Sequence, residues 1–145
     1  MIVVGGGFGG LSTALNLAAA PDAPAVLLVE PQERFLFLPL LYELLSGELQ
    51  IAPRYAELLA GRGVAWLQER VLRIDHANRM VHTDGGRSLA WSGLVIATGG
   101  RSQTFGIPGV SEHCLGFRSL ADVTRLQQLV QRLRLRLRPP SVWTI

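Results

Sequence analysis

The sequence predicts an α/β fold in which helices cover a parallel β-sheet. The first indication is a βαβ pattern, since apolar strands expected at residues 1–4 and 25–30 flank a segment of helical periodicity at 8–20. The second is that both strands are apolar throughout, as parallel strands covered on both faces are. The third is a glycine-rich turn between the first strand and the helix. Together these features favour a parallel sheet with helices packed on it.

The glycine-rich turn has the spacing of a dinucleotide-binding fingerprint, Gly5-x-Gly7-x-x-Gly10. In such a turn the first glycine allows a sharp bend, the second lets the backbone approach a pyrophosphate, and the third lets the helix pack close to the sheet. The first amides of the helix have no internal partners and attract phosphate. The turn therefore predicts a Rossmann-like dinucleotide site.

An acidic residue completes this fingerprint. Glu30 ends the second apolar strand, 20 residues after Gly10. A carboxylate at that position can accept hydrogen bonds from both ribose hydroxyls, which would explain an otherwise unpaired Glu. The alternative is a βαβ unit whose glycines serve only packing and whose Glu30 is a solvated strand end.

Two short helices are expected after the second strand. Residues 34–43 are strongly apolar without a clear period, so they form either an ordinary core segment or a wall of the cofactor site. Pro39 is expected to begin a helix that runs to Ser46 and stops at Gly47. The other helix is expected over residues 53–60 and should end at the glycines of 61–63.

A small antiparallel meander is expected next, inserted between parallel strands. Its strands are predicted at 64–68, 71–75, 80–83 and 88–91, with a hairpin turn at 84–87. Residues 94–100 then return to a buried parallel strand that ends in small residues. Thr98 and Gly99 either bring the backbone close to a ligand or simply form a strand-to-loop turn.

The basic charge of the chain is concentrated in its last residues. The net charge is +3, but residues 1–117 carry eight arginines and ten acidic residues, whereas 118–145 carry six arginines and one acidic residue. After a turn at 106–109, a helix with a leucine stripe is expected over 120–133, with Ser119 as its cap. The alternating leucines and arginines of 132–138 predict a strand or a frayed end. This tail either contacts an anionic membrane or forms a solvated helix face or disordered end.

Composition excludes several classes of protein. With 48% hydrophobic and 17% charged residues, the chain is neither disordered nor a nucleic-acid-binding arm. The single Cys114 excludes an intramolecular disulfide and a CxxC site, and His76, His82 and His113 lack metal-ligand spacing and are expected on the surface. No signal peptide and no apolar run of about 18 to 20 residues are present, which predicts a cytoplasmic protein.

Four segments in order carry a resemblance to a known family: residues 4–11, 37–43, 96–100 and 105–110. Their sequences, VGGGFGGL, FLPLLYE, IATGG and FGIPGV, resemble the type II NADH dehydrogenases. These are single-chain FAD flavoproteins of the pyridine nucleotide-disulfide oxidoreductase class. The likeness extends to about Leu129, and the Pro-Leu-Leu-Tyr segment is more particular to the type II enzymes than the glycine fingerprint.

The resemblance implies hydride transfer from NADH to FAD, followed by transfer of two electrons to a quinone without proton pumping. FAD carries the redox chemistry, so no catalytic side chain is expected. The resemblance also implies peripheral contact of the full-length enzyme with the inner face of a membrane. A homodimer is a further expectation, and no metal and no nucleic acid are expected.

The resemblance assigns roles to residues at matching positions. The FAD pyrophosphate would be held by the turn, through Gly5, Gly7, Phe8, Gly9 and Gly10. Glu30 would bind the adenosine ribose, and Val71 would offer its backbone to the adenine. Pro39 and Leu40 would lie near the flavin. The pyrophosphate and ribityl side would be lined by Ala97, Thr98 and Gly99.

The sequence departs from the family in lacking a second Gly-x-Gly-x-x-Gly for NADH, a late Gly-Asp motif and a C-terminal membrane-docking region. The predicted organisation is therefore an incomplete, truncated FAD-binding domain at 1–117, followed at 118–145 by a helix and arginine-rich tail leading toward an NADH-binding domain. We expect the isolated chain to lack turnover and to aggregate or bind FAD weakly.

Two alternatives remain open from the sequence. One is an inactive, truncated dinucleotide-binding module without turnover, which the missing NADH fingerprint motivates. The other is a relative of the sulfide:quinone type, which relays sulfur through paired cysteines. The lone Cys114 argues against this second alternative.

Overall fold

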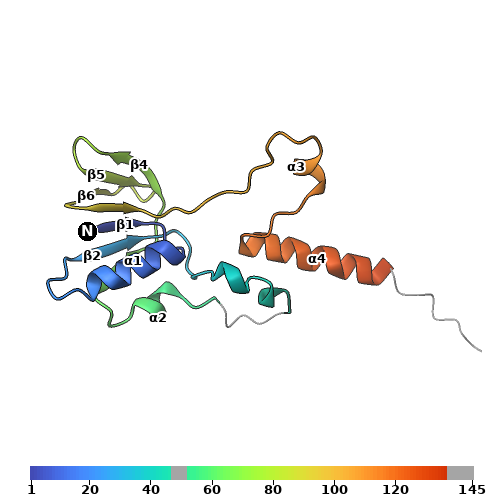
Figure 1. The fold of residues 1–145 in the computed structure, drawn as a ribbon, viewed down its shortest axis with the longest axis horizontal. Coiled ribbons are helices and arrows are strands. Elements are labelled where there is room, and N and C mark those ends of the chain that lie inside the picture. Colours follow the sequence, from blue (N-terminus) through green and yellow to red (C-terminus); the bar gives the residue numbers. More distant parts are fainter. Residues whose placement is uncertain (47–51, 137–145) are drawn as a thin grey trace, which may run out of the picture. The chain divides into compact units, whose positions relative to one another are not determined.

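The computed structural model describes residues 1–46 and 52–136, which divide into two units (Figure 1). The first unit comprises residues 1–37 and 52–101 and contains all the strands. The second comprises the described residues of 38–51 and 102–145 and contains only helices and loops. Each unit is described by itself below.

The first unit is built on a four-stranded parallel sheet, which confirms the predicted fold class. Its strands are β1 (Ile2–Val4), β2 (Val26–Val29), β3 (Val64–Leu67) and β7 (Leu94–Ile96), in the order β3-β2-β1-β7. Val3 lies opposite Leu28 on one side and Val95 on the other. The pairs β1–β2, β1–β7 and β2–β3 are all parallel. The carboxyl ends of the four strands therefore meet at one edge of the sheet.

Helices α1 (Phe8–Ala18) and α2 (Tyr55–Leu59) pack with one face of this sheet, as Figure 1 shows. Alternate strand residues such as Val3 and Leu28 point to that face and are completely buried with Ala14. The helices expected at 8–20 and 53–60 are confirmed with slightly shorter bounds. The first ends before Pro21, because proline cannot continue the helical hydrogen bonds.

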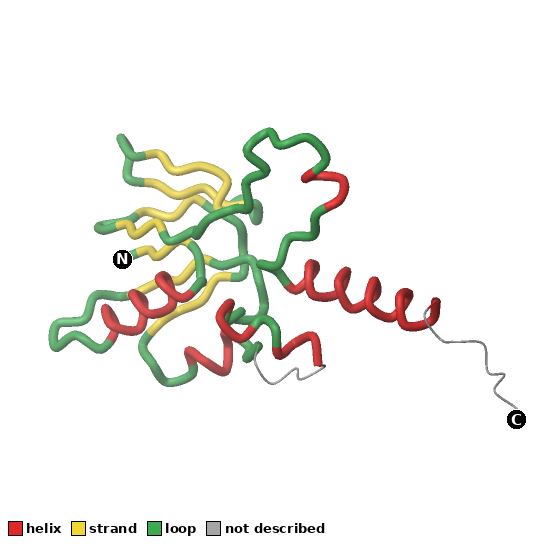
Figure 2. The backbone as a smooth tube through the Cα atoms, turned by 45° about the vertical axis from the view of Figure 1, so that its right-hand side comes forward, coloured by secondary structure: helices red, strands yellow, loops and turns green. Residues whose placement is uncertain are grey.

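The other face of the parallel sheet carries the predicted antiparallel meander. Its strands are β4 (Val71–Asp75), β5 (Met80–Thr83) and β6 (Ser88–Ala90), and Figure 2 shows the strands of the first unit in two groups. Ile2, Val4 and Val29 form a second buried cluster with Val81. The strand expected at 64–68 belongs to the parallel sheet as β3 and not to the meander, because it pairs with β2.

In the second unit, the single helix predicted over 39–46 is wrong. Two 3₁₀ turns occur instead, η1 (Leu38–Leu40) and η2 (Glu43–Ser46). The Leu41 amide donates to the Leu38 carbonyl and the Leu45 amide to the Tyr42 carbonyl, each at 3.1 Å. These bonds join residues three apart, as in 3₁₀ turns, and not four apart, as in an α-helix. The expected stop at Gly47 lies outside the described residues.

Helix α4 (Leu120–Arg136) is longer than predicted, and the short helix α3 (Val110–His113) precedes it. The strand or frayed end expected at 132–138 is wrong for the part that the structure describes. Leu and Arg both favour helices, and the described part of this unit offers no strand for pairing, so extending the helix satisfies the backbone. No helix within residues 1–46 and 52–136 combines the length and apolarity needed to cross a bilayer.

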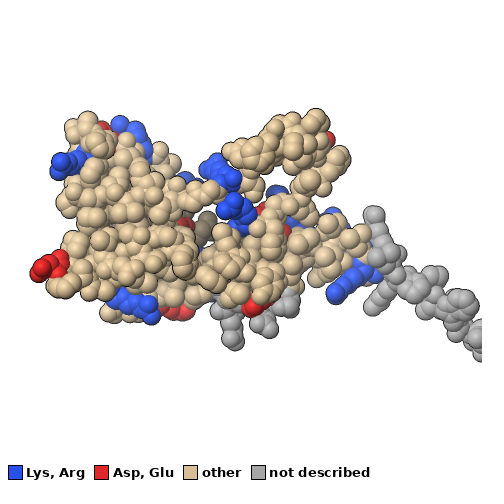
Figure 3. Space-filling view, viewed as in Figure 1, with Lys and Arg blue, Asp and Glu red and all other residues tan. Residues whose placement is uncertain are grey.

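The predicted apolar stripe of α4 is mostly uncovered. Val123 is buried, and the Gln127 side chain donates to the Leu44 carbonyl at 2.8 Å, which fixes α4 against η2. The other members of the stripe are half-buried or exposed: Leu120, Leu126, Leu129, Val130 and Leu133. In the view of Figure 3, charged side chains form separate small groups on a largely uncharged surface.

Candidate functional site

A cavity of about 570 Å³ lies at the carboxyl edge of the parallel sheet. Its volume is typical of small-molecule sites, and this edge is where open α/β sheets bind their ligands. All the lining residues belong to the first unit: Val4, Gly5, Val29, Glu30, Pro31, Gln32, Arg70, Val71, Thr98, Gly99 and Arg101. Five of the predicted site residues therefore line one cavity.

Two glycines of the Gly-x-Gly-x-x-Gly fingerprint, Gly5 and Gly10, are required by close packing against backbone. Gly5 has a φ of +95°, and a Cβ there would come within 2.5 Å of the Ala97 carbonyl oxygen. A Cβ on Gly10 would overlap the Gly5 carbonyl oxygen. These approaches let the chain bend directly off β1 and bring α1 close to the sheet.

Gly7 and Gly9 of the turn face open space. A Cβ on Gly7 or Gly9 would meet nothing within 4 Å, and both residues are exposed. Gly7 is the N-cap of α1 and provides no side-chain hydrogen bond to it. The first amides of α1 are thus available to an anion from outside, and the positive end of the helix dipole favours one there. The residues present fit the pyrophosphate of a dinucleotide.

Glu30 lies directly beside this turn, because β1 and β2 are neighbours in register. Its carboxylate accepts hydrogen bonds from the Gly6 amide at 2.6 Å and from the Gln32 amide at 2.9 Å. The interpretation of Glu30 as unpaired is therefore wrong, since it joins the end of β2 to the glycine turn. A carboxylate offers about four acceptor positions, so capacity for ribose hydroxyls remains.

Tyr55 is a site residue that the sequence reasoning missed. It is only 2% exposed, and its hydroxyl donates to the Gly6 carbonyl oxygen at 2.6 Å. Both backbone groups of Gly6 are thereby held, the N–H by Glu30 and the carbonyl by Tyr55. Burial raises the pKa of the Tyr55 hydroxyl, and the Glu30 carboxylate raises it further. The hydroxyl therefore stays a neutral donor near physiological pH.

A row of aromatic rings supports Tyr55 from the side of the core. The Tyr55 ring lies 5.6 Å from that of Trp66 and 6.2 Å from that of Phe35, measured between centroids. The row continues through Phe37 to Phe8, which is 70% exposed at the start of α1. Phe35 is buried, so the front of the apolar segment 34–43 is core.

Arg70 and Arg101 on the cavity wall were also missed. Their positions could have indicated them, because Arg70 directly precedes Val71 and Arg101 closely follows Gly99. The predicted residues outside the lining set are Gly7, Phe8, Gly9, Gly10 and Ala97, and these belong to the adjoining turn or contact it. Pro39 and Leu40 form η1 in the second unit, and their role near the flavin stays a prediction.

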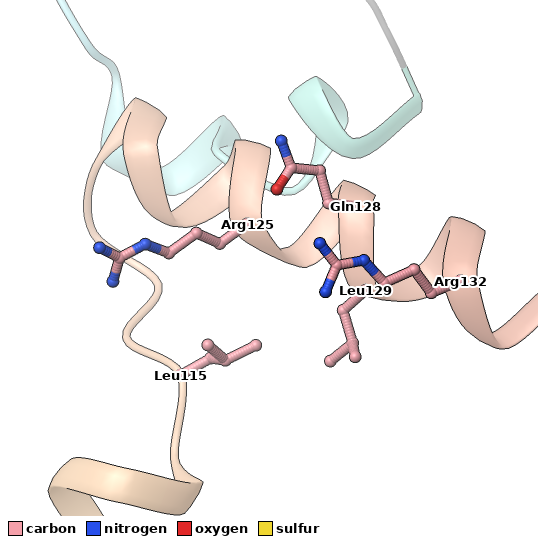
Figure 4. A pocket seen from close by; sticks show the side chains of 5 residues that line it. All are labelled: Leu115, Arg125, Gln128, Leu129 and Arg132. Carbon is pink, nitrogen blue, oxygen red and sulfur yellow. The ribbon is translucent and has the colours of Figure 1, made fainter.

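The second unit has a smaller cavity of about 230 Å³, shown in Figure 4. Four of its lining residues come from α4 and one from the loop after α3: Arg125, Gln128, Leu129, Arg132 and Leu115. It contains no predicted site residue.

The titratable side chains do not gather into a metal site in the part of the chain that the structure describes. His76 and His113 are exposed as expected. His82 differs, because it is half-buried and contacts Arg73 at 2.8 Å and Ser88 at 3.0 Å. Cys114 is exposed.

Known proteins show similarity to the chain over most of its length. Demethylphylloquinone reductase NdbB of Synechocystis sp. is 42% identical over 142 residues, which covers 90% of this chain and 35% of that protein. Alternative NAD(P)H-ubiquinone oxidoreductase C1 of Arabidopsis thaliana is 40% identical and covers 90% of this chain and 29% of its own length. This chain thus spans about a third of the length of these relatives.

A solved structure agrees with the fold. The sulfide:quinone oxidoreductase of Aquifex aeolicus superposes with a TM-score of 0.81 at 28% identity, over 94% of this chain and 32% of that one. The predicted resemblance to quinone-reducing NAD(P)H dehydrogenases is confirmed by the two relatives above. Because the family model for pyridine nucleotide-disulphide oxidoreductases matches residues 1–137, the chain belongs to that family.

Proposed function

We propose that this chain is the FAD-binding part of a non-proton-pumping NADH:quinone oxidoreductase. The observation that carries the proposal is the arrangement of Glu30 beside an open glycine turn that adjoins a cavity of about 570 Å³. The names of the two relatives, a demethylphylloquinone reductase and an NAD(P)H-ubiquinone oxidoreductase, support a quinone as the electron acceptor.

The residues of this chain would bind and orient the cofactor without acid or base catalysis. The first amides of α1, from Gly7 to Gly10, would hold the pyrophosphate, while Glu30 would accept hydrogen bonds from the ribose. The backbone of Val71 would meet the adenine, and Thr98 and Gly99 would line the ribityl side. FAD, when bound, would supply the redox chemistry that connects NADH to quinone. Contact with a membrane and a homodimer belong to the same proposal for the complete protein.

Flavin titration of the purified chain tests this proposal. We expect the soluble fraction of the wild-type protein to quench FAD fluorescence saturably, with the weak affinity expected of the isolated chain. The Gly9→Leu variant should lose most of that binding, because the new side chain enters the open space beside the first turn of α1. The fold should survive, since Leu is a better helix former than Gly. The matched control is Asn16→Leu, an exposed position on the same helix. Absent FAD binding, or equal binding by Gly9→Leu, would contradict the proposal.

A second candidate is favoured by the superposition on sulfide:quinone oxidoreductase. In that case the complete protein would take electrons from sulfide in place of NADH. Steady-state assays with a short-chain quinone and either donor separate the two, since the same FAD site serves both. If the complete protein reduced quinone with sulfide and not with NADH, sulfide would take the place of NADH as the proposed electron donor. The proposed FAD site would be unaffected.

A further inference from the structure

The carboxyl edge of the parallel sheet presents charged groups in a fixed order. The strand order β3-β2-β1-β7 places Arg70 beyond one end strand and Arg101 beyond the other. Between them come Glu30, after β2, and the glycine turn, after β1. Along one cavity the chain therefore presents a cation, a carboxylate, a set of amides and a second cation.

Neither cation has a side-chain partner among the residues that the structure describes. Four other arginines of the first unit are engaged: Arg34 with the Ala52 carbonyl, Arg54 with Glu33, Arg73 with Asp75 and Arg87 with Glu69. Among the described residues, the guanidinium groups of Arg70 and Arg101 form no such bond, although both line the cavity. Their donors remain available to a ligand.

The backbone that carries Arg70 is held in place. Its amide donates to the Asp84 carboxylate at 2.8 Å, and its carbonyl accepts from the Asp84 amide at 2.9 Å. The next residue is Val71, at the start of β4 and also on the cavity wall. Arg70 is thus presented from a fixed point on the side of Glu30 away from the glycine turn.

Arg101 stands on the opposite side of the cavity. It follows Thr98 and Gly99 on the wall, and the preceding Ala97 packs directly against Gly5. The Ala97 amide also donates to the Val4 carbonyl at 2.8 Å, which ties this segment to the end of β1. Arg101 therefore shares the side of the edge where the amides of α1 begin.

We propose that the two arginines recognise different parts of a bound adenine dinucleotide: Arg101 the diphosphate and Arg70 the adenine ring. The inference rests on the proposed function for the register of the ligand, with the ribose at Glu30 and the phosphates at the glycine turn. A ligand in that register extends its adenine toward β3 and β4, where Arg70 lies. Its diphosphate lies toward β1 and β7, where Arg101 lies.

The chemistry of guanidinium suits both tasks. Its planar donors match phosphate oxygens, with which they form strong charge-assisted hydrogen bonds. The same plane stacks on aromatic rings and adds a cation–π attraction. The first contact depends on the charge of the ligand, whereas the second depends on its ring.

Calorimetric titration of the 145-residue chain with ADP and with adenosine separates the two roles. The Arg101→Gln variant should bind ADP about tenfold more weakly than wild type, because it loses a hydrogen bond to a charged phosphate. Its binding of adenosine, which has no phosphate, should be unchanged. Loss of the ring contact in Arg70→Gln should weaken ADP and adenosine by the same factor, about fivefold. The matched control is Arg62→Gln, an exposed arginine outside the cavity, which should bind both ligands like wild type.

Two results with ADP and adenosine would overturn the inference, and a third comes from FAD. One is ADP binding by Arg101→Gln at wild-type affinity, and the other is a loss in Arg70→Gln that affects ADP but spares adenosine. An FAD titration of the same proteins keeps the proposed function separate. If both arginine variants bound FAD with wild-type affinity, this inference would be refuted and the proposed function would stand. If the chain bound ADP through the two arginines but did not bind FAD, the flavin assignment alone would be refuted.

Discussion

The parallel sheet of the first unit and helix α4 of the second differ in how completely their apolar side chains are covered. Leu28 in β2 has no exposed surface, because helices cover one face of the sheet and the antiparallel strands cover the other. Leu129 in α4 is 40% exposed, and Leu135 is 70% exposed. The compared residues are all leucines, so the layers that cover them, and not the residue type, decide the burial.

The same contrast holds for polar groups. In the glycine turn, the Gly6 amide and carbonyl both have side-chain partners from distant parts of the chain, Glu30 and Tyr55. In α4, the side chains of Arg125 and Arg132 are exposed. The conformation of the glycine turn is fixed by several hydrogen bonds and packing contacts from distant residues. Helix α4 is stabilised mainly by its own hydrogen bonds and its N-terminal cap. Substitutions should therefore cost much more in the first region.

The largest contrast is expected between Leu28→Ala and Leu129→Ala. Truncating a fully buried leucine should lower the free energy of unfolding by about 3 kcal/mol, because it leaves a cavity between covered layers. The same change at Leu129 should cost less than about 1 kcal/mol, since the side chain is half in water. Urea unfolding followed by circular dichroism measures both. Equal costs would show that α4 is covered as fully as the sheet.

A second comparison lies within the glycine turn, between Gly10→Ala and Gly9→Ala. The Gly10 Cβ would overlap the Gly5 carbonyl oxygen, so the backbone must shift at a cost of about 2 kcal/mol. Gly9 has open space and lies in the first turn of α1, so alanine there should stabilise by about 0.5 kcal/mol. Opposite signs in urea unfolding are expected. A loss at Gly9 equal to that at Gly10 would contradict the packing described here.

Tyr55→Phe tests the hydrogen bond from the Tyr55 hydroxyl to the Gly6 carbonyl in the glycine turn. The buried Gly6 carbonyl would lose its hydroxyl donor, which should cost about 1.5 kcal/mol of unfolding free energy. The change also has a pH signature, because the pKa of Tyr55 is raised in the folded protein. The native state then holds this proton more tightly than the unfolded state, so stability should fall as pH rises above about 10.

The control for that pH dependence is Tyr42→Phe, since Tyr42 is exposed. Tyr55→Phe should remove the alkaline loss of stability that this tyrosine causes, whereas Tyr42→Phe should retain it. If Tyr55→Phe still lost as much stability at alkaline pH as the wild type, that loss would come from another titrating group.

The sequence predicted the parts of the site that are encoded by short spacing. Gly5, Gly10 and Glu30 belong to one βαβ unit, so their proximity follows from its regular geometry. Tyr55 could not be found in this way, because it lies 49 residues from Gly6 and its partner is a backbone carbonyl, which carries no sequence signal. Arg70 and Arg101 stood next to predicted positions, but only the strand order brings them to one cavity.

The fold followed a similar division. Strands and helices with a clear period were predicted within a few residues, as at β4 and β5. The placement of residues 64–68 in the parallel sheet depends on pairing with β2, which local pattern does not contain. The stripe of α4 was correctly identified as helical, but periodicity shows which residues share a face and not what covers that face.

The smallest effect is expected at the start of α4, where Ser119 and Asp122 form a reciprocal cap. The Asp122 amide donates to the Ser119 hydroxyl at 3.2 Å, and the Ser119 amide donates to the Asp122 carboxylate at 2.9 Å. Ser119→Ala should destabilise the helix by about 1 kcal/mol. Amide hydrogen exchange in α4 measures this loss, and Thr124→Ala, farther along the exposed face, is its control.

The cap also predicts an acid dependence that is specific to α4. The Arg118 amide and the Ser119 hydroxyl and amide hold the pKa of Asp122 below its ordinary value. The folded helix therefore binds this proton less readily than the unfolded chain does, so protection of α4 should be full above about pH 4 and fall as pH drops further. Asp122→Asn should remove this dependence, and Ser119→Ala should weaken it. If the protection of α4 in Asp122→Asn fell with acid as it does in the wild type, α4 would depend on contacts outside its cap. It would then resemble the parallel sheet, whose residues are held by contacts from other elements.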